Sequence, residues 1–173
     1  MIIINNFGHL KYKKYKFRCS LGKAGIGIKK KEGDKITPKG TFKIIKVYYR
    51  SDKIKKFRSD FDLIKINKNM GWCNDSRSLQ YNKQVVLPTR FSHEKLLRKD
   101  NLYDLICVLN FNSNPVIKNK GSAIFIHISR KKYKPTSGCV ALTKNKLIKL
   151  LKIIKKNTKI KIHLEKIAEP ILT

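Results

Sequence analysis

Two residues near the end of the chain are of the types and at the spacing that thiol catalysis requires. His127 ends an apolar, β-rich run, and Cys139 follows it by twelve positions, at the start of another apolar run. A cysteine thiol becomes an effective nucleophile when an imidazole lies within hydrogen-bonding reach of it. The loop between them contains Pro135 and Gly138, which favours a strand–loop–strand return that brings both side chains together. The pattern therefore predicts a nucleophile and its base.

The glycine before the cysteine suits the same chemistry. Gly138 leaves the backbone uncrowded, so the amide groups near Gly138 and Cys139 are candidates for stabilising an acyl oxyanion. A structural interpretation stays open beside this one. A solitary cysteine is most often a small buried hydrophobe, and a solitary histidine is most often a hydrogen-bonded structural residue.

The segment around the cysteine resembles a known signature. Residues 136–142 read TSGCVAL, which is similar to the Ser/Thr-His-Gly-Cys-Val-Arg-Leu block of the YkuD-type L,D-transpeptidases. On this resemblance His127 corresponds to the family's base and Cys139 to its nucleophile. Ser137 stands where the commonest form has a second histidine, and Ala141 stands where it has an arginine. These departures indicate a divergent branch whose substrate contacts differ at both positions.

Other segments resemble the same branch, so that the resemblance extends over roughly residues 20–163. They are residues 31–42 (KEGDKITPKGTF), 71–75 (GWCND), 92–96 (SHEKL), 102–105 (LYDL) and 121–127 (GSAIFIH). The resemblance implies substrate contacts at Thr136, Ser137, His93, Trp72 and Tyr103. Two of these have structural alternatives of their own. His93 follows Ser92, a candidate helix cap, and Trp72 would serve equally well as a core anchor.

The resemblance implies a reaction as well. In that family the cysteine attacks the carbonyl between a diamino acid and D-alanine in a peptidoglycan stem peptide, and the thioester passes to an amine (transpeptidation) or to water (carboxypeptidation). No metal or cofactor is required. The alternative from another class is a non-catalytic module that holds an anionic cell-wall polymer or nucleic acid through its lysines, and Ser137 and Ala141 favour it.

The charge of the chain is extreme. Its 173 residues include 41 Lys and Arg against 11 Asp and Glu, a formal net charge of +30. An anionic cell-wall or membrane surface is one explanation. Codon bias in an AT-rich genome, which raises lysine together with isoleucine and asparagine, is the other. The basic residues are spread along the chain rather than grouped in one arm, which disfavours nucleic acid as the partner. We expect a monomer.

The cysteines and the N-terminus bear on metal binding, disulfides and the cellular compartment. The four cysteines, Cys19, Cys73, Cys107 and Cys139, form no zinc-type spacing, and a nucleophilic Cys139 leaves an odd three, so we expect neither a metal site nor a disulfide framework. The apolar N-terminal stretch is too short for a signal peptide. The implied substrate nevertheless places the protein in the periplasm or cell envelope.

The patterning predicts a mainly β sandwich or barrel, formed as one domain over residues 1–173. The resemblance implies the L,D-transpeptidase fold, which is a β-sandwich with small helices packed on it. Expected strands cover residues 2–4, 12–18, 41–49, 63–66, 103–109 and 158–164. Residues 93–97 are expected to form a short helical turn capped by Ser92. An amphipathic helix over residues 144–156, capped by Thr143, is expected to pack on the sheet.

Overall fold

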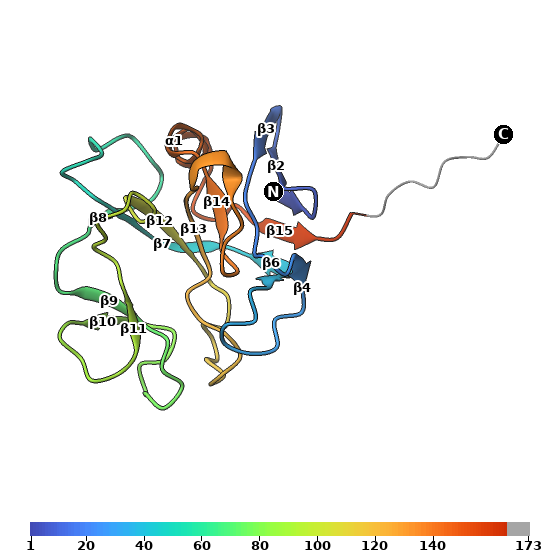
Figure 1. The fold of residues 1–173 in the computed structure, drawn as a ribbon. Coiled ribbons are helices and arrows are strands. Elements are labelled where there is room, and N and C mark those ends of the chain that lie inside the picture. The colour runs from blue at the N-terminus through green and yellow to red at the C-terminus, as the bar shows by residue number, and fades with distance from the viewer. Residues whose placement is uncertain (166–173) are drawn as a thin grey trace.

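The structure, a computed structural model, describes residues 1–165, so the last eight positions of the predicted domain lie outside the described residues. One five-stranded sheet joins the beginning of the chain to residues near its end (Figure 1). Its order is β3 (Tyr15–Arg18), β2 (His9–Tyr12), β1 (Ile2–Asn5), β15 (Ile160–His163) and β6 (Gly40–Phe42). Strands β1 and β15 pair in parallel.

A second five-stranded sheet carries the catalytic candidates. Its order is β14 (Val140–Leu142), β13 (Phe125–Ile128), β12 (Leu105–Leu109), β7 (Ile44–Tyr49) and β8 (Leu63–Lys65). All five residues of β12 are buried, because other elements cover both faces of this central strand. Such continuous burial explains why an apolar run, rather than an alternating pattern, encodes it.

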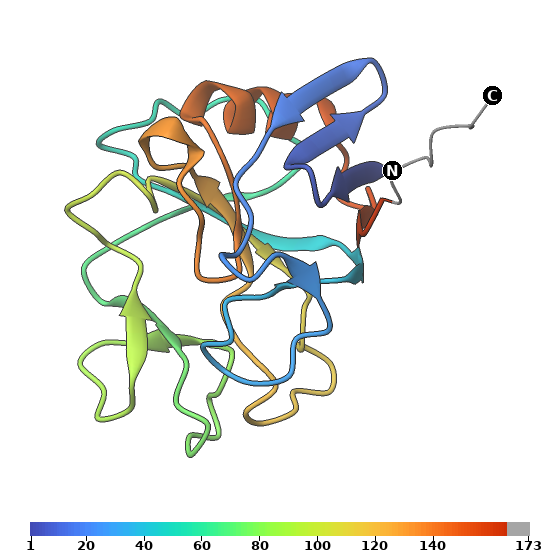
Figure 2. The ribbon, with the colours of Figure 1, turned by 45° about the vertical axis from the view of Figure 1, so that its right-hand side comes forward.

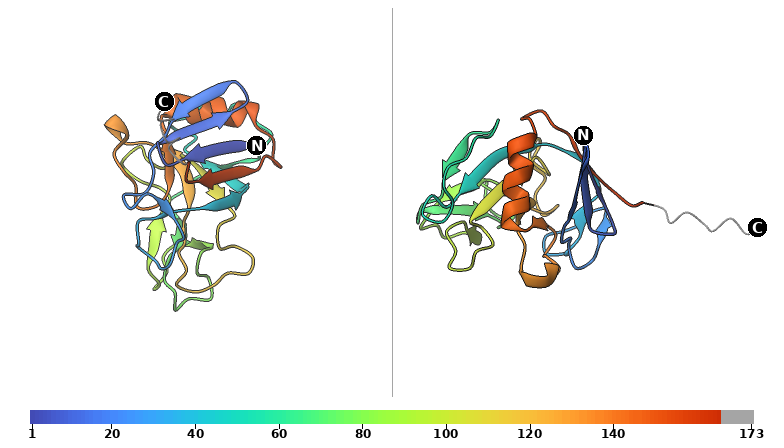
Figure 3. Two further views of the ribbon diagram at one scale, coloured as in Figure 1. Left: turned by 90° about the vertical axis from the view of Figure 1, so that its right-hand side faces the viewer. Right: turned by 90° about the horizontal axis from the view of Figure 1, so that it is seen from above.

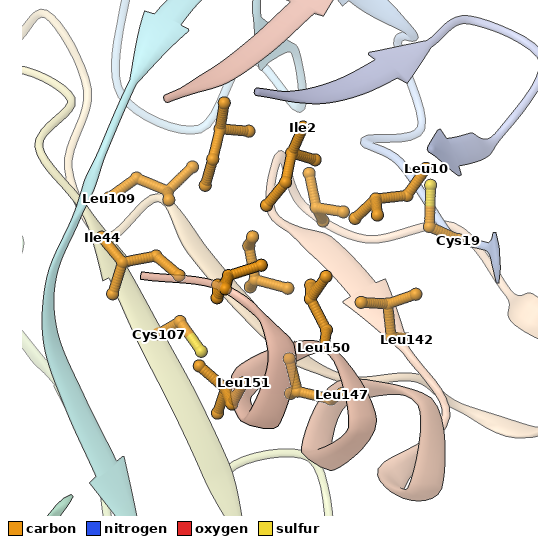
Figure 4. Packing of buried hydrophobic residues seen from close by; sticks show 14 of the residues in the cluster. Ile2, Leu10, Cys19, Ile44, Cys107, Leu109, Leu142, Leu147, Leu150 and Leu151 are labelled. Atoms are coloured by element: carbon orange, nitrogen blue, oxygen red, sulfur yellow. The ribbon is translucent and has the colours of Figure 1, made fainter. Parts of the chain in front are cut away.

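The main core lies between these two sheets and is closed at one end by α1 (Lys144–Ile153), as the view from above in Figure 3 shows. The helix buries Leu147, Leu150 and Leu151, the stripe that the 3.6-residue period predicts. In Figure 4 these leucines meet Ile2 and Leu10 from one sheet and side chains of the other sheet. The predicted mainly β sandwich is confirmed.

Smaller elements lie outside the sandwich. A three-stranded sheet of β10 (Gln84–Val86), β9 (Met70–Cys73) and β11 (His93–Lys95) packs beyond β7 and β12, at the end of the molecule away from α1 (Figure 2). A two-stranded piece consists of β4 (Ile26–Gly27) and β5 (Thr37–Pro38). The 3₁₀ turn η1 (Lys131–Tyr133) lies in the loop between β13 and β14.

The predicted helical turn at residues 93–97 is wrong. His93 to Lys95 form β11, which pairs antiparallel with β9. Ser92 does not cap a helix; its N–H donates instead to the Asp75 carboxylate at 3.3 Å. Tertiary pairing with β9 therefore overrides a local capping signal.

The expected strand over residues 41–49 is two strands. The break is at Lys43, whose N–H donates to the Asn110 side chain at 2.7 Å, and the chain passes there from one sheet to the other. Residues 12–18 likewise form a hairpin rather than one strand, with a turn at Lys13, whose φ is +50°. The other expected strands match within about two residues, and α1 ends at Ile153 rather than at 156. Thr143 makes no side-chain capping bond.

Candidate active site

His127 lies on β13, a strand whose two faces have different surroundings. Ile126 and Ile128 point into the main core, whereas Phe125 and His127 point to the other face. The His127 side chain is buried, and its Nδ1 donates to the carbonyl oxygen of Ile128 at 2.9 Å. A carbonyl only accepts, so this bond keeps the proton on Nδ1 and leaves Nε2 as an acceptor. That is the tautomer that a general base requires.

Cys139 lies directly before β14, which pairs with β13 in parallel rather than as the hairpin that the spacing favoured. Because Ile126 is opposite Val140, the cysteine lies beside Phe125, on the same face as His127. Its Sγ accepts the Phe125 N–H at 3.4 Å and donates to the Ala123 carbonyl at 3.1 Å. His127 and Cys139 line one cleft.

The resting pair is electrically neutral. Burial lowers the pKa of His127 to about 4, against the weaker effect of its bond to Ile128. Burial also raises the pKa of Cys139 to about 12, and the nearby Glu94 carboxylate adds to that shift, while the Phe125 N–H and Lys29 oppose it. Both effects disfavour a resting thiolate–imidazolium pair. Cys139 still keeps partial exposure, unlike the other three cysteines, which are buried and free.

Thr136 holds the loop that presents the sulfur. Its hydroxyl donates to the Cys139 carbonyl at 2.6 Å and accepts the Gly138 N–H at 3.1 Å. Its backbone pairs with Leu21 and Lys23 of the glycine-containing turn. The side chain predicted to contact substrate is therefore occupied in positioning the loop. Ser137 is exposed and lines the cleft.

Gly138 is required by its surroundings. Its φ is +134°, and a Cβ there would lie 2.9 Å from the Ile36 carbonyl oxygen. The Cα of Gly138 lies 3.0 Å from where a Cβ on Gly22 would stand, and the Gly22 N–H donates to the buried Thr37 hydroxyl at 2.7 Å. Two glycines and a threonine from separate segments thus pack together beside the loop that carries Cys139. Sequence spacing gave no sign of the contact with Gly22.

Tyr103 lies against the histidine, in the cleft where the sequence placed it. Its ring is edge-to-face with His127, with centroids 5.4 Å apart at 72°. Its hydroxyl donates to Glu94, and Arg98 lies over its ring at 4.9 Å from the centroid. Burial raises the pKa of Glu94, although Tyr103 and Arg98 oppose that shift. Sequence reasoning missed Glu94 and Arg98; strand alternation around His93 is the signal that points Glu94 to the other face.

Two predicted substrate contacts do not line the cleft. His93 is on the opposite face of β11 from Glu94, and its Nδ1 is bonded to the Phe91 carbonyl at 2.8 Å. Trp72 is 5% exposed, donates its indole N–H to Asn82 at 3.0 Å and meets Phe125 edge-on with centroids 5.3 Å apart. Of the two alternatives for Trp72, the structure therefore shows the core anchor. Its ring packs against Phe125 of β13, the residue beside Cys139.

The cleft has a volume of about 380 Å³ and carries both signs of charge. Its acidic lining residues include Glu32 and Glu94, and its basic lining residues include Lys29, Arg98 and Arg130. The Asn74 Oδ1 and the Ser122 Oγ also border it, and both are buried without a hydrogen-bond partner. Such atoms are costly unless a ligand or water satisfies them.

Within residues 1–165, no group of three or more His, Cys, Asp or Glu side chains is placed to hold a metal ion. In that same part of the chain, no helix combines the length and apolarity needed to cross a bilayer.

Comparison with known proteins places the chain in a family. The search of curated proteins found no match. The family model described as YkuD, L,D-transpeptidase catalytic domain, matches residues 6–162, which is most of the chain and includes His127 and Cys139. The chain thus belongs to the L,D-transpeptidase catalytic domain family.

Proposed function

We propose that this domain is a cysteine acyl-transferase that acts on peptidoglycan stem peptides, with Cys139 as nucleophile and His127 as general base. One observation carries the proposal. The Nδ1 of His127 is fixed on the Ile128 carbonyl, which leaves Nε2 as the proton acceptor, and His127 lines the same cleft as Cys139, which is partly exposed while Cys19, Cys73 and Cys107 are buried. Membership of the L,D-transpeptidase family supports the substrate class.

The proposed first half-reaction starts from the neutral pair. The thiol turns from the Ala123 carbonyl toward His127, whose Nε2 takes the proton as sulfur attacks the carbonyl between the third stem residue and D-alanine. The C–S bond forms, and the C–N bond breaks as the imidazolium returns the proton to the departing amine of D-alanine. A thioester on Cys139 remains.

The second half-reaction resolves the thioester. An amine of another stem attacks it in transpeptidation, or water attacks it in carboxypeptidation, and His127 takes the proton of that nucleophile before returning it to the sulfur. Because Thr136 already accepts the Gly138 N–H, we assign the Cys139 N–H as the oxyanion donor near the sulfur. Gly138 then acts through the backbone conformation it permits.

Intact-protein mass spectrometry tests the nucleophile. The resemblance implies that a carbapenem acylates the catalytic cysteine, so the parent protein should gain one inhibitor mass and Cys139→Ala should gain none. The three buried cysteines serve as internal controls, because they remain in the variant. An unmodified parent protein, together with no turnover of stem tetrapeptide, would favour the non-catalytic module.

Product analysis separates the two acyl acceptors. With a tetrapeptide donor and an excess of acceptor amine, a transpeptidase yields a cross-linked dimer, whereas a carboxypeptidase yields the tripeptide. We further propose that one monomeric domain spans the chain and acts in the cell envelope, where its substrate lies. Analytical ultracentrifugation and fractionation of cells check these two statements.

A further inference from the structure

Acidic residues are absent from two long segments of the chain. None occurs in residues 1–31 or in residues 105–164, which together contain 23 Lys and Arg. These segments include the hairpin β2–β3, the turn η1 and the helix α1. Figure 2 shows these three elements gathered at one end of the molecule, opposite the three-stranded sheet.

Contacts between basic and aromatic side chains join the three elements into one surface. The ring of Tyr133 in η1 is flanked by Arg18 of β3, at 5.1 Å from the centroid, and by Lys146 of α1, at 5.8 Å. The ring of Tyr15 in β3 is covered by Lys149 of α1 at 4.8 Å. With Lys14, which lies over Tyr15 at 5.9 Å, these six residues define the basic–aromatic face.

The charges of this face are uncompensated within the described part of the chain. Seven ion pairs are found among residues 1–165, and none includes a cation of the basic–aromatic face. Phe7 is 49% exposed and borders the same shallow depression as Arg18 and Tyr133. An exposed aromatic ring thus lies at the edge of a dense positive surface.

We propose that the basic–aromatic face docks the domain on an anionic phospholipid bilayer, with Phe7 entering the headgroup region. Lysines and arginines near a membrane surface are attracted to anionic headgroups, and an adjacent aromatic side chain adds apolar contact. The proposal does not depend on the chemistry of Cys139.

The arrangement of the rings favours lipid over nucleic acid. Proteins that bind single-stranded nucleic acid stack bases on free aromatic faces. Here Tyr15 is stacked on Phe17, with centroids 6.2 Å apart at 5°, and Lys149 covers it. Tyr133 is flanked by two cations. These rings therefore support a charged surface rather than offer places for bases.

Co-sedimentation with vesicles tests the proposal. The parent protein should bind vesicles of phosphatidylcholine with about 30 mol% phosphatidylglycerol in about 0.1 M salt and should not bind phosphatidylcholine alone. The triple variant K14Q/K146Q/K149Q should bind the anionic vesicles about 100-fold more weakly, from about fivefold per charge. Phe7→Ser alone should also weaken binding to the anionic vesicles, and it should remove the fraction of binding that persists at high salt.

A matched variant separates the effect of the basic–aromatic face from the effect of net charge. K65Q/K68Q/K83Q removes the same number of charges from exposed lysines around β8, β9 and β10, at the other end of the molecule (Figure 1). This variant and Cys139→Ser should bind like the parent. Equal losses in the two triple variants would overturn the proposal, because net charge alone would explain them. Tighter binding to an oligonucleotide than to the vesicles, lost in K14Q/K146Q/K149Q, would overturn it in favour of a polyanion site.

Discussion

The two faces of strand β13 lie in different surroundings, although the residues of both faces alternate within the same four positions. Ile126 and Ile128 enter the core between the two five-stranded sheets, where aliphatic side chains from both sheets and α1 meet. Phe125 and His127 enter a smaller cluster, where Trp72 and Tyr103 pack. One strand therefore ties the stability of the sandwich to the position of the histidine.

The difference lies in what burial does to ionisable groups. On the aliphatic face, burial alone stabilises the fold. On the other face, burial lowers the pKa of His127 and raises that of Cys139, so both groups favour their neutral forms. Burial on the second face therefore acts on protonation, whereas burial on the first face acts on stability.

The largest expected effect is on the face of β13 that carries Phe125 and His127 and lies beside Cys139. Cys139→Ala should lower acyl transfer by about 10³-fold or more, because the other three cysteines are buried and cannot replace its thiol. The free energy of unfolding should change by about 1 kcal/mol or less, since only one partly exposed sulfur is removed. Turnover of stem peptide and urea unfolding measure the two quantities. Wild-type turnover in the variant would disprove the assignment of the nucleophile.

On the aliphatic face the effect should fall on stability instead. Ile126→Ala should lower the free energy of unfolding by about 3–4 kcal/mol, because Ile126 is fully buried between the sheets. The matched control is Ile45→Ala on β7, where the side chain is 49% exposed and the cost should be about 1 kcal/mol or less. Urea unfolding compares them. Equal costs would mean that Ile126 does not anchor the core.

A pH titration of stability sharpens the comparison. The folded pKa of His127, about 4, lies below its ordinary value of 6.5, so the unfolded chain binds more protons between these values. The stabilisation is present above about pH 6.5 and is lost as pH falls through about 4, a difference of about 3 kcal/mol. The free energy of unfolding of the parent should therefore fall more steeply over this window than that of His127→Gln. Parallel profiles would show that His127 is not held neutral by burial.

The smallest expected effect concerns the loop between β13 and β14, which carries Thr136 and leads to Cys139. Thr136→Val removes the hydroxyl that bonds the Cys139 carbonyl and the Gly138 N–H, which should cost about 1–2 kcal/mol of stability. The value of kcat should fall more than KM changes, because the loop positions sulfur rather than substrate. Thr136→Ser keeps the hydroxyl and should restore both. A rise in KM alone would indicate a substrate contact instead.

Local pattern predicted much of this protein because the signals concerned are short-range. The apolar stripe of Leu147, Leu150 and Leu151 predicted α1, and the apolar run around Ile126 predicted β13. The family was predicted from blocks such as residues 136–142 and is confirmed. In each case neighbouring residues carry the information, so no knowledge of distant contacts is needed.

Other features depend on pairing between distant segments. Residues 93–97 read as a capped turn, yet β9 pairs with them as a strand, and this pairing points His93 away from the cleft and Glu94 into it. The fit of Gly22 against Gly138 joins segments more than a hundred positions apart. Strand direction is another such feature, because the short loop fits a hairpin, whereas β13 and β14 run in parallel.

The sequence by itself determined that a histidine lies in one apolar strand and a cysteine directly before another, because residue type and spacing are written locally. Only the tertiary structure decided which groups surround them. The neutral state of both groups follows from burial, and the presence of Glu94 beside them follows from the pairing of β11 with β9. Such contacts are set by how sheets pack, and packing depends on the whole chain at once.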